Sequence, residues 1–265
     1  MILSPRGPFG LMVIALSALA FAYLLLPLLV VILAPLGETG YLAFPPQGLT
    51  LKWYRAALSD PRYLSSFWTS VWIAGIAAVL STAVGIMAAY GLTRGRFPGS
   101  QALEAFFLSP LILPTLVLAV GLSLYFTRIG FVAGTSRLIA AHLIVCTPYV
   151  IRVTLPVFRR FDRALEEAAQ SLGASPLSAF FLVFLPVVRP GITAGATMAF
   201  ITSFDEVVLA LFLADPGAPT LPVTIYSAVQ LGFEPSVAAV SGLLVLATTA
   251  LLLLSQLFTK AGRSF

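Results

Sequence analysis

The chain has 265 residues, of which 59% are hydrophobic and 9% are charged, and its mean hydropathy is +1.01. Soluble domains carry about 25% charged residues, so this composition excludes a chain surrounded mainly by water and predicts an integral membrane protein. The net charge of +5 does not indicate nucleic-acid binding, because the basic residues do not cluster on a polar, aromatic-bearing surface. We therefore expect no nucleic-acid partner and assign the excess of cations to orientation in a bilayer.

Six apolar stretches are each long enough to cross the hydrocarbon core, which needs about 20 residues. They are residues 9–34, 67–92, 103–125, 137–158, 187–213 and 236–258. Backbone groups in lipid must be hydrogen-bonded internally, so helices are expected throughout. The first stretch follows Arg6 as in a signal peptide but lacks a small-residue cleavage site, so we expect it to remain as the first span. The sequence thus predicts an all-α integral membrane protein with six transmembrane helices in a single domain, residues 1–265.

Lysines and arginines fall mainly on one side of these spans, which predicts the orientation. With the N-terminus inside, ten lie on the cytoplasmic side and five outside. The inner set is Arg6, Arg94, Arg96, Arg152, Arg159, Arg160, Arg163, Arg189, Lys260 and Arg263; the outer set is Lys52, Arg55, Arg62, Arg128 and Arg137. We therefore expect both termini in the cytoplasm.

Two outer segments and several prolines add local expectations. The segment 35–66 contains an amphipathic stretch, Leu51 to Leu58, that predicts a short surface helix, and the segment 214–235 predicts a re-entrant or surface-lying piece. Pro110 and Pro114 in the third span and Pro148 in the fourth should kink their helices, as packing devices or around a translocation path. Inspection finds no internal repeat of the kind common in secondary transporters.

The single cysteine and the single histidine limit the chemistry available to the chain. Cys146 leaves no intramolecular disulfide and no thiol set for a metal cluster. His142 provides no multi-histidine metal site and has no nearby carboxylate for a catalytic triad. We expect both residues to be packed in a membrane helix, His142 with a hydrogen bond, and we expect no catalytic, cofactor-binding or metal-binding residue.

The long inner segment 159–186 predicts two short amphipathic helices. The first carries an apolar stripe opposite a polar side and ends at Gly173. Ser175 can cap a second helix that begins at Pro176 and stops at Leu185–Pro186. The first stripe is Phe161, Leu165, Ala168, Ala169 and Leu172, and the second apolar face is Leu177, Phe180, Phe181 and Phe184. Such a surface can dock into a protein, or lie on the inner leaflet with the arginines near lipid phosphates.

The same segment resembles the EAA loop of binding-protein-dependent ABC importer permeases, whose pattern is E-A-A-x3-G-x9-I-x-L-P. Glu167-Ala168-Ala169, Gly173 and Leu185-Pro186 match it, and Val183 stands where the family usually has isoleucine. The resemblance implies the type I (MetI-like) permease architecture in a bacterial inner membrane, with a cytoplasmic coupling helix after Gly173. Glu167 would anchor the interface with an ATPase electrostatically, Gly173 would permit the tight turn, and Leu177, Phe180 and Phe181 would contact the ATPase.

The resemblance also implies the partners. These are a second permease subunit forming a heterodimer, two cytoplasmic ABC ATPase subunits and a periplasmic substrate-binding protein. The chain has no G-x-x-x-x-G-K-[ST] phosphate loop, so we do not expect it to hydrolyse ATP itself. ATP and Mg²⁺ would bind to the partner ATPase. Competing interpretations are a stand-alone secondary transporter or channel, and a non-transporting scaffold.

Two further runs are similar to the spermidine/putrescine-type permeases, namely residues 203–208 and 221–227. Within the first run, Asp205 and Glu206 place two carboxylates in the fifth span, each at a cost of about 2.5 to 3.5 kcal/mol. Thr202 would share a broad polar face with them, and a water-filled path there would attract a polyamine. Alternatively, the acids pair with an arginine of a partner or are hydrated at the outer interface. Permeases of this kind also handle 4-aminobutyrate-like, phosphonate or metal-chelate substrates.

Overall fold

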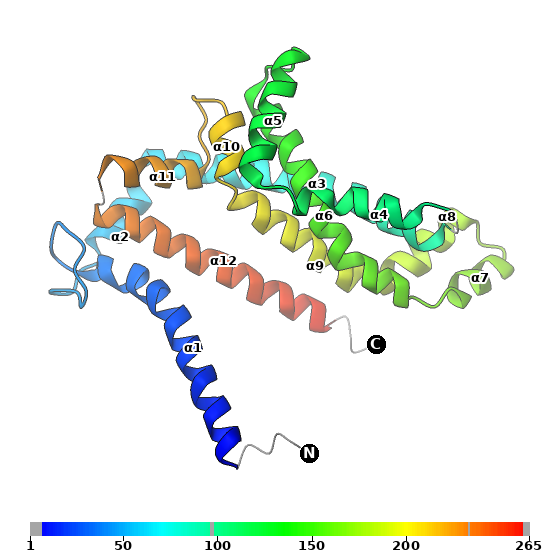
Figure 1. The fold of residues 1–265 in the computed structure, drawn as a ribbon, viewed down its shortest axis with the longest axis horizontal. Helices are drawn as coiled ribbons and strands as arrows, with labels where there is room; N and C mark the ends of the chain where they lie inside the picture. The colour runs from blue at the N-terminus through cyan, green and yellow to red at the C-terminus, as the bar shows by residue number, and fades with distance from the viewer. Residues whose placement is uncertain (1–6, 96–97, 233, 262–265) are drawn as a thin grey trace. The chain divides into compact units, whose positions relative to one another are not determined.

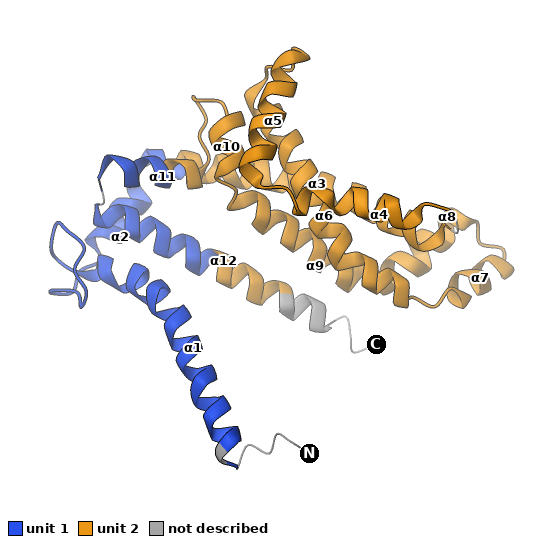
Figure 2. Cartoon of the chain, in the orientation of Figure 1, with its two compact units in different colours: residues 1–64, 225–247 blue, residues 65–224, 248–265 orange. Residues whose placement is uncertain are grey.

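The computed structural model describes residues 7–95, 98–232 and 234–261, and this part of the chain consists of helices and connecting loops, with no strand (Figure 1). The single expected domain forms two compact units (Figure 2). The first comprises residues 1–64 and 225–247, and the second comprises residues 65–224 and 248–265. Arg6, Arg96 and Arg263, which we placed in the cytoplasm, lie outside the described residues.

Five described helices are long and apolar enough to cross a membrane, and a bent pair raises the number to six if it counts as one span. Four of the expected spans are confirmed as continuous helices, because an apolar run in lipid has no other way to bond its backbone. They are α1 (Pro8–Leu33), α3 (Pro61–Arg94), α6 (Gly134–Arg160) and α12 (Pro235–Ala261). Helix α1 continues into the 3₁₀ turn η1 (Ala34–Leu36).

The third expected span, 103–125, is wrong as a single straight helix. Helix α4 (Ser100–Leu108) and the 3₁₀ turn η2 (Ser109–Leu111) lead to a break, and α5 (Thr115–Arg128) follows at an angle of 97°. Pro114 has no N–H to give to the carbonyl of Pro110, and it forces Leu113 out of the helical conformation. The two prolines therefore break the helix, where a kink was expected.

The fifth expected span, 187–213, is also interrupted. Helix α9 (Leu185–Phe204) ends at Asp205, and the short helix α10 (Val208–Leu213) begins three residues later. The side chain of Glu206 accepts hydrogen bonds from the backbone N–H groups of Val208 (2.9 Å) and Leu209 (3.2 Å). Because this carboxylate satisfies the free donors at the start of α10, a new helix begins there.

The second unit is built around the packing of α6 against α9 (Figure 1). Gly191, Gly195 and Ala199 recur every fourth residue along α9, and all three are buried. A Cβ on Gly191 would lie 2.9 Å from Val157 on α6, and one on Gly195 would lie 3.2 Å from Thr154. Small residues at this spacing let two membrane helices approach closely, and dispersion contacts then hold them together.

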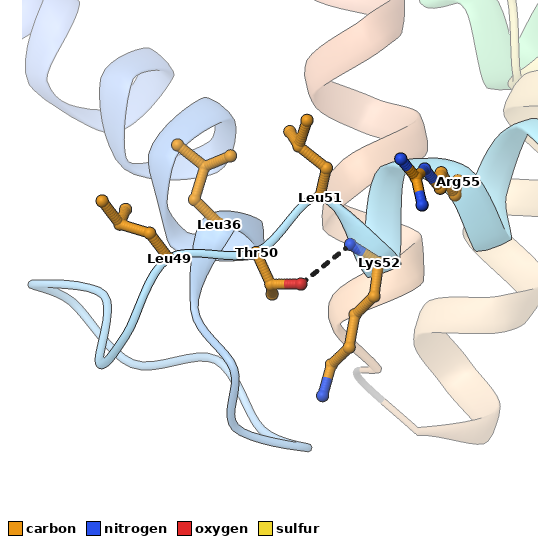
Figure 3. A pocket seen from close by; sticks show the side chains of 6 residues that line it. All are labelled: Leu36, Leu49, Thr50, Leu51, Lys52 and Arg55. Atoms are coloured by element: carbon orange, nitrogen blue, oxygen red, sulfur yellow. Dashed lines mark hydrogen bonds between the residues drawn. The ribbon is translucent and has the colours of Figure 1, made fainter.

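In the first unit, the expected surface helix is confirmed as α2 (Lys52–Ser59). Its aromatic residues bind the end of α1: Trp53 donates its indole N–H to the carbonyl of Gly37 (3.1 Å), and Tyr54 donates its hydroxyl to that of Ile32 (2.5 Å). An open hollow lies beside the start of α2 (Figure 3). Its lining consists of Leu36, Leu49, Thr50, Leu51, Lys52 and Arg55.

The outer segment 214–235 contains the apolar helix α11 (Leu221–Leu231), as expected for a short piece in that segment. The buried hydroxyl of Ser70 on α3 accepts a hydrogen bond from the backbone N–H of Leu221 at 2.8 Å. This contact satisfies one of the free donors at the start of α11 and fixes it to α3.

Candidate coupling loop and substrate path

The loop 159–186 begins with α7 (Ala164–Ser171), which ends at Gly173 as the sequence predicts. Gly173 has φ +97°, and the turn is closed by two hydrogen bonds, from its own N–H to Gln170 (2.9 Å) and from the N–H of Ala174 to Ala169 (3.0 Å). A Cβ at Gly173 would meet no atom within 4 Å. Glycine is therefore favoured here by the left-handed backbone conformation rather than by crowding.

The second predicted helix begins where expected, with α8 (Pro176–Ala179). The hydroxyl of Ser175 accepts a hydrogen bond from the backbone N–H of Ser178 at 3.1 Å, so Ser175 is the N-cap and Pro176 occupies the first helical position. Both features were readable from the sequence because they depend on neighbours within four residues.

The expected stop at Leu185–Pro186 is wrong. Helix α8 continues through a π-helical turn, η3 (Phe180–Phe184), directly into α9, so that residues 176–204 form one continuous helical segment. In the π turn the N–H of Leu185 bonds to the carbonyl of Phe180, five residues back. Pro186 lies inside this continuous segment, directly after the π turn, where the helical hydrogen-bond pattern already changes register. The second helix of the loop is thereby joined to the fifth span without an intervening loop.

The expected coupling residues divide into an outward and an inward set. Most of them are exposed, namely Glu167, Ala168, Gly173, Leu177, Phe181 and Pro186, whereas Ala169, Phe180 and Leu185 are half-buried. Leu177 is 68% exposed and Phe181 is 53% exposed. Phe180, by contrast, packs on its own chain, with its ring centroid 4.9 Å from Tyr90 and 5.5 Å from Phe184. The loop thus exposes the apolar side chains of Leu177 and Phe181, while Phe180 beneath them packs on other aromatic rings of the chain.

Sequence reasoning missed Glu166, because a carboxylate beside an apolar stripe is expected to face water. Its side chain is buried between α7 and α3, where it forms an ion pair with Arg94, the last residue of α3. The hydroxyl of Tyr90 also donates to Glu166, at 3.3 Å. Glu166 lies three residues before the half-buried Ala169, so helical spacing alone indicates that it faces the inner side of α7. Its partner Arg94 could not be identified in this way, because it lies 72 residues away in the sequence.

The three expected path residues meet at the break between α9 and α10. Thr202 lies in the last turn of α9 and is half-buried. Asp205 is exposed, and no hydrogen bond or ion pair of its carboxylate occurs among the described residues. Glu206 is half-buried and caps α10, as described above. The broad polar face of an unbroken helix is therefore wrong, and of the two path carboxylates that of Asp205 has no partner among the described residues, whereas that of Glu206 caps α10.

His142 is buried on α6, and its Nδ1 atom lies 2.5 Å from the hydroxyl of Ser203 on α9. This confirms the expected packed and hydrogen-bonded histidine. Cys146, one turn further along α6, is also buried as expected. The pair His142–Ser203 joins α6 to α9 two residues before Asp205 and so fixes the end of α9.

A set of membrane-length helices, interrupted at a free carboxylate and joined to a loop of exposed apolar side chains, defines a multi-pass membrane protein. Residues 81–261 match the family model described as "Binding-protein-dependent transport system inner membrane component". The chain therefore belongs to this family. It is a permease subunit of an ABC importer and lies in the inner membrane.

Individual relatives agree with this assignment. The chain is 34% identical to the putrescine transport system permease protein PotI of Escherichia coli (strain K12), over 91% of this chain and 86% of that protein. It is 32% identical to the spermidine/putrescine transport system permease protein PotC of Haemophilus influenzae, over 91% and 93%. A solved chain of a bacterial ABC transporter that imports the acidic polysaccharide alginate has the same fold, with a TM-score of 0.71, 16% identity and 95% of both chains covered.

Proposed function

We propose that this chain forms half of a heterodimeric permease that two cytoplasmic ABC ATPase subunits drive and that a periplasmic binding protein supplies. Both termini and the loop 159–186 would then face the cytoplasm. The observation that carries this proposal is the apolar surface left exposed on the loop. It includes Leu172, Leu177 and Phe181, which are 90%, 68% and 53% exposed. Burying such side chains against a partner favours the complex, because it removes apolar surface from water.

Each loop residue has a distinct role in this proposal. Leu177 and Phe181 enter a groove of the ATPase, and Phe180 and Leu185 support them from the inner side. Glu167, exposed in the first turn of α7, pairs with a cation of the ATPase. Ala168 and Ala169 allow the ATPase to approach the helix closely. ATP and Mg²⁺ bind to the ATPase, so no cofactor is needed in this chain.

The docking role can be tested by co-purification of the ATPase subunits with the permease. Leu177→Asp places a charge on the docking surface and should reduce the amount of bound ATPase by about tenfold or more, since an unpaired charge buried at an interface costs several kcal/mol. Leu58→Asp is the matched control, because Leu58 is similarly exposed (58%) but lies on α2 in the outer segment. Equal ATPase recovery with both variants would contradict the proposed docking surface.

We further propose that the substrate is a polyamine such as putrescine or spermidine, or a related small amine. The substrates named for the two relatives, putrescine and spermidine/putrescine, support this, because the similarity extends over 91% of the chain. The free carboxylate of Asp205 supports it independently, since it can pair with an ammonium group next to the half-buried Thr202. Glu206 contributes by holding the start of α10, and therefore the position of Asp205.

Uptake of labelled putrescine into proteoliposomes that contain the complete transporter tests the substrate. Asp205→Asn should raise the KM for putrescine by about tenfold, because a hydrogen bond to a charged group is worth about 1.5–3 kcal/mol. The basal ATPase rate should stay unchanged. An unchanged KM would contradict the role of Asp205. Absence of putrescine uptake, together with uptake of labelled 4-aminobutyrate, an aminophosphonate or a metal chelate by the same vesicles, would replace the polyamine with that solute.

A stand-alone secondary transporter or channel is the competing class. It predicts that the purified chain alone takes up substrate when an ion gradient is imposed across the proteoliposome membrane. Our proposal predicts no uptake under that condition and uptake only with the ATPase subunits and ATP. The two measurements use the same vesicles and separate the two classes directly.

A further inference from the structure

The loop 159–186 is joined by the chain itself to α6 and α9, and by side chains to α3. Glu166 on α7 binds Arg94 at the end of α3, and both side chains are largely buried, with 9% and 18% exposed. Arg163, at the start of α7, donates to the backbone carbonyl of Thr93, also at the end of α3. The start of α7 is therefore fixed to α3 at two adjacent points.

Aromatic rings surround the cation of this pair. The guanidinium carbon of Arg94 lies 5.2 Å from the ring centroid of Tyr90, 5.5 Å from that of Phe161 and 5.4 Å from that of Phe184. Phe184 belongs to the π turn η3, and its ring is also 4.9 Å from that of Phe158 on α6. One arginine thus contacts side chains from α3, from the end of α6 and from the turn that leads into α9.

A buried ion pair is an inefficient way to gain stability, because desolvation of the two charges offsets much of their attraction. Apolar side chains of similar size would serve as well for packing alone. What the pair does provide is one fixed geometry, because each charge must stay with its partner. Its position between the docking helices and a long membrane helix suits a mechanical connection.

We propose that Arg94 and Glu166 are positioning residues that transmit movement of the docking loop to α3, in addition to the covalent path into α9. This inference rests on the proposed docking of the loop to an ATPase. When the ATPase moves the exposed side of α7 and α8, the buried pair makes the cytoplasmic end of α3 move with them. Without the pair, α3 would be linked to the loop only through the Arg163–Thr93 hydrogen bond and the ring contacts of Tyr90, which hold it less firmly than a buried ion pair.

The test measures substrate molecules imported per ATP hydrolysed by the reconstituted transporter. The variant Arg94→Gln/Glu166→Gln removes both charges and leaves no lone buried charge. We expect the ATPase subunits to remain bound and active, while the imported-substrate-to-ATP ratio falls about tenfold, which lies within the usual range of coupling between sites. A ratio equal to that of the wild type would overturn the proposal.

A matched control is provided by the exposed pair Arg159–Glu104, which joins α6 to α4 at 2.5 Å with 55% and 25% of the two side chains exposed. Arg159→Gln/Glu104→Gln should leave the ratio unchanged, and an equal loss there would overturn the assignment to the buried pair. Failure of Arg94→Gln/Glu166→Gln to assemble would assign the buried pair to folding and overturn its positioning role. A wild-type transporter that shows no ATP-dependent uptake would instead contradict the proposed function.

Discussion

The turn at Gly173 allows a prediction whose magnitude follows from the backbone alone. The φ angle of +97° lies in the left-handed region, and a Cβ at this position would meet no atom within 4 Å. A substitution therefore causes no clash, and its cost is the conformational penalty of an ordinary L-residue, about 1–2 kcal/mol. Asparagine tolerates this conformation better than other residues, so its penalty is smaller.

This penalty lowers the fraction of molecules in which residues 170–174 adopt the turn seen in the structure. A penalty of about 1–2 kcal/mol changes an equilibrium by a factor of about 5 to 30. If the docking surface needs the Gly173 turn, then Gly173→Leu and Gly173→Val should lower the ratio of imported substrate to hydrolysed ATP by up to that factor. Gly173→Ala should lower it less than valine, because alanine is not β-branched, and Gly173→Asn should stay near the wild type.

The assay is uptake and ATP hydrolysis measured on the same proteoliposomes, with ATPase recovery as the control for assembly. The ranking of the four variants by their uptake-to-ATP ratio tests whether the left-handed backbone at Gly173 is the cause. If Gly173→Asn and Gly173→Val lost activity equally, the left-handed backbone would not be the cause. If Gly173→Leu kept normal assembly and normal substrate-stimulated ATP hydrolysis with full uptake, the turn would have no part in coupling.

Three further outcomes follow from contacts within the second unit. Gly85→Ala on α3 would place a Cβ 2.6 Å from a methyl group of Val150 and should destabilise the protein by about 1–3 kcal/mol. The measurement is the unfolding temperature in detergent, which should fall. Gly91→Ala on the same helix is the control, because a Cβ there would meet nothing within 4 Å, and it should leave the unfolding temperature unchanged. Ser175→Ala removes the cap of α8 and should cost about 1 kcal/mol, and unchanged amide exchange in α8 would contradict this. Glu206→Gln keeps an acceptor for the N–H groups of α10 but weakens it, so amide exchange at α10 should rise while ATPase recovery stays constant.

In the loop 159–186, short sequence patterns predicted some helix ends correctly and one wrongly. The glycine that ends α7 and the serine that caps α8 act on neighbours within a few residues, so both were predicted correctly. The end of the second helix was predicted wrongly, because a proline that stops a helix and one that lies inside a continuous helical segment look the same in sequence. The π turn η3 decides between them, and it depends on the packing of its aromatic rings.

At the candidate substrate path, too, the sequence indicated the region but not the task of each residue. Two adjacent carboxylates in an apolar run were visible at once as unusual, so the sequence singled out the region where the structure has the break between α9 and α10. Their different tasks were not visible, because Glu206 uses its side chain to begin α10 while Asp205 remains exposed. A carboxylate that caps a helix and one that is free have the same neighbours in sequence until the backbone break is known.

By itself, the sequence determined the membrane class, four continuous spans, and the end of α7 and the start of α8 in the loop 159–186, because hydropathy and short-range capping act along the chain. Only the tertiary structure decided that the third span bends by 97°, that the fifth is interrupted at Asp205, and that Glu166 binds Arg94. These features depend on which distant segments meet. A buried carboxylate and its arginine, 72 residues apart, become partners only when α7 packs against the end of α3.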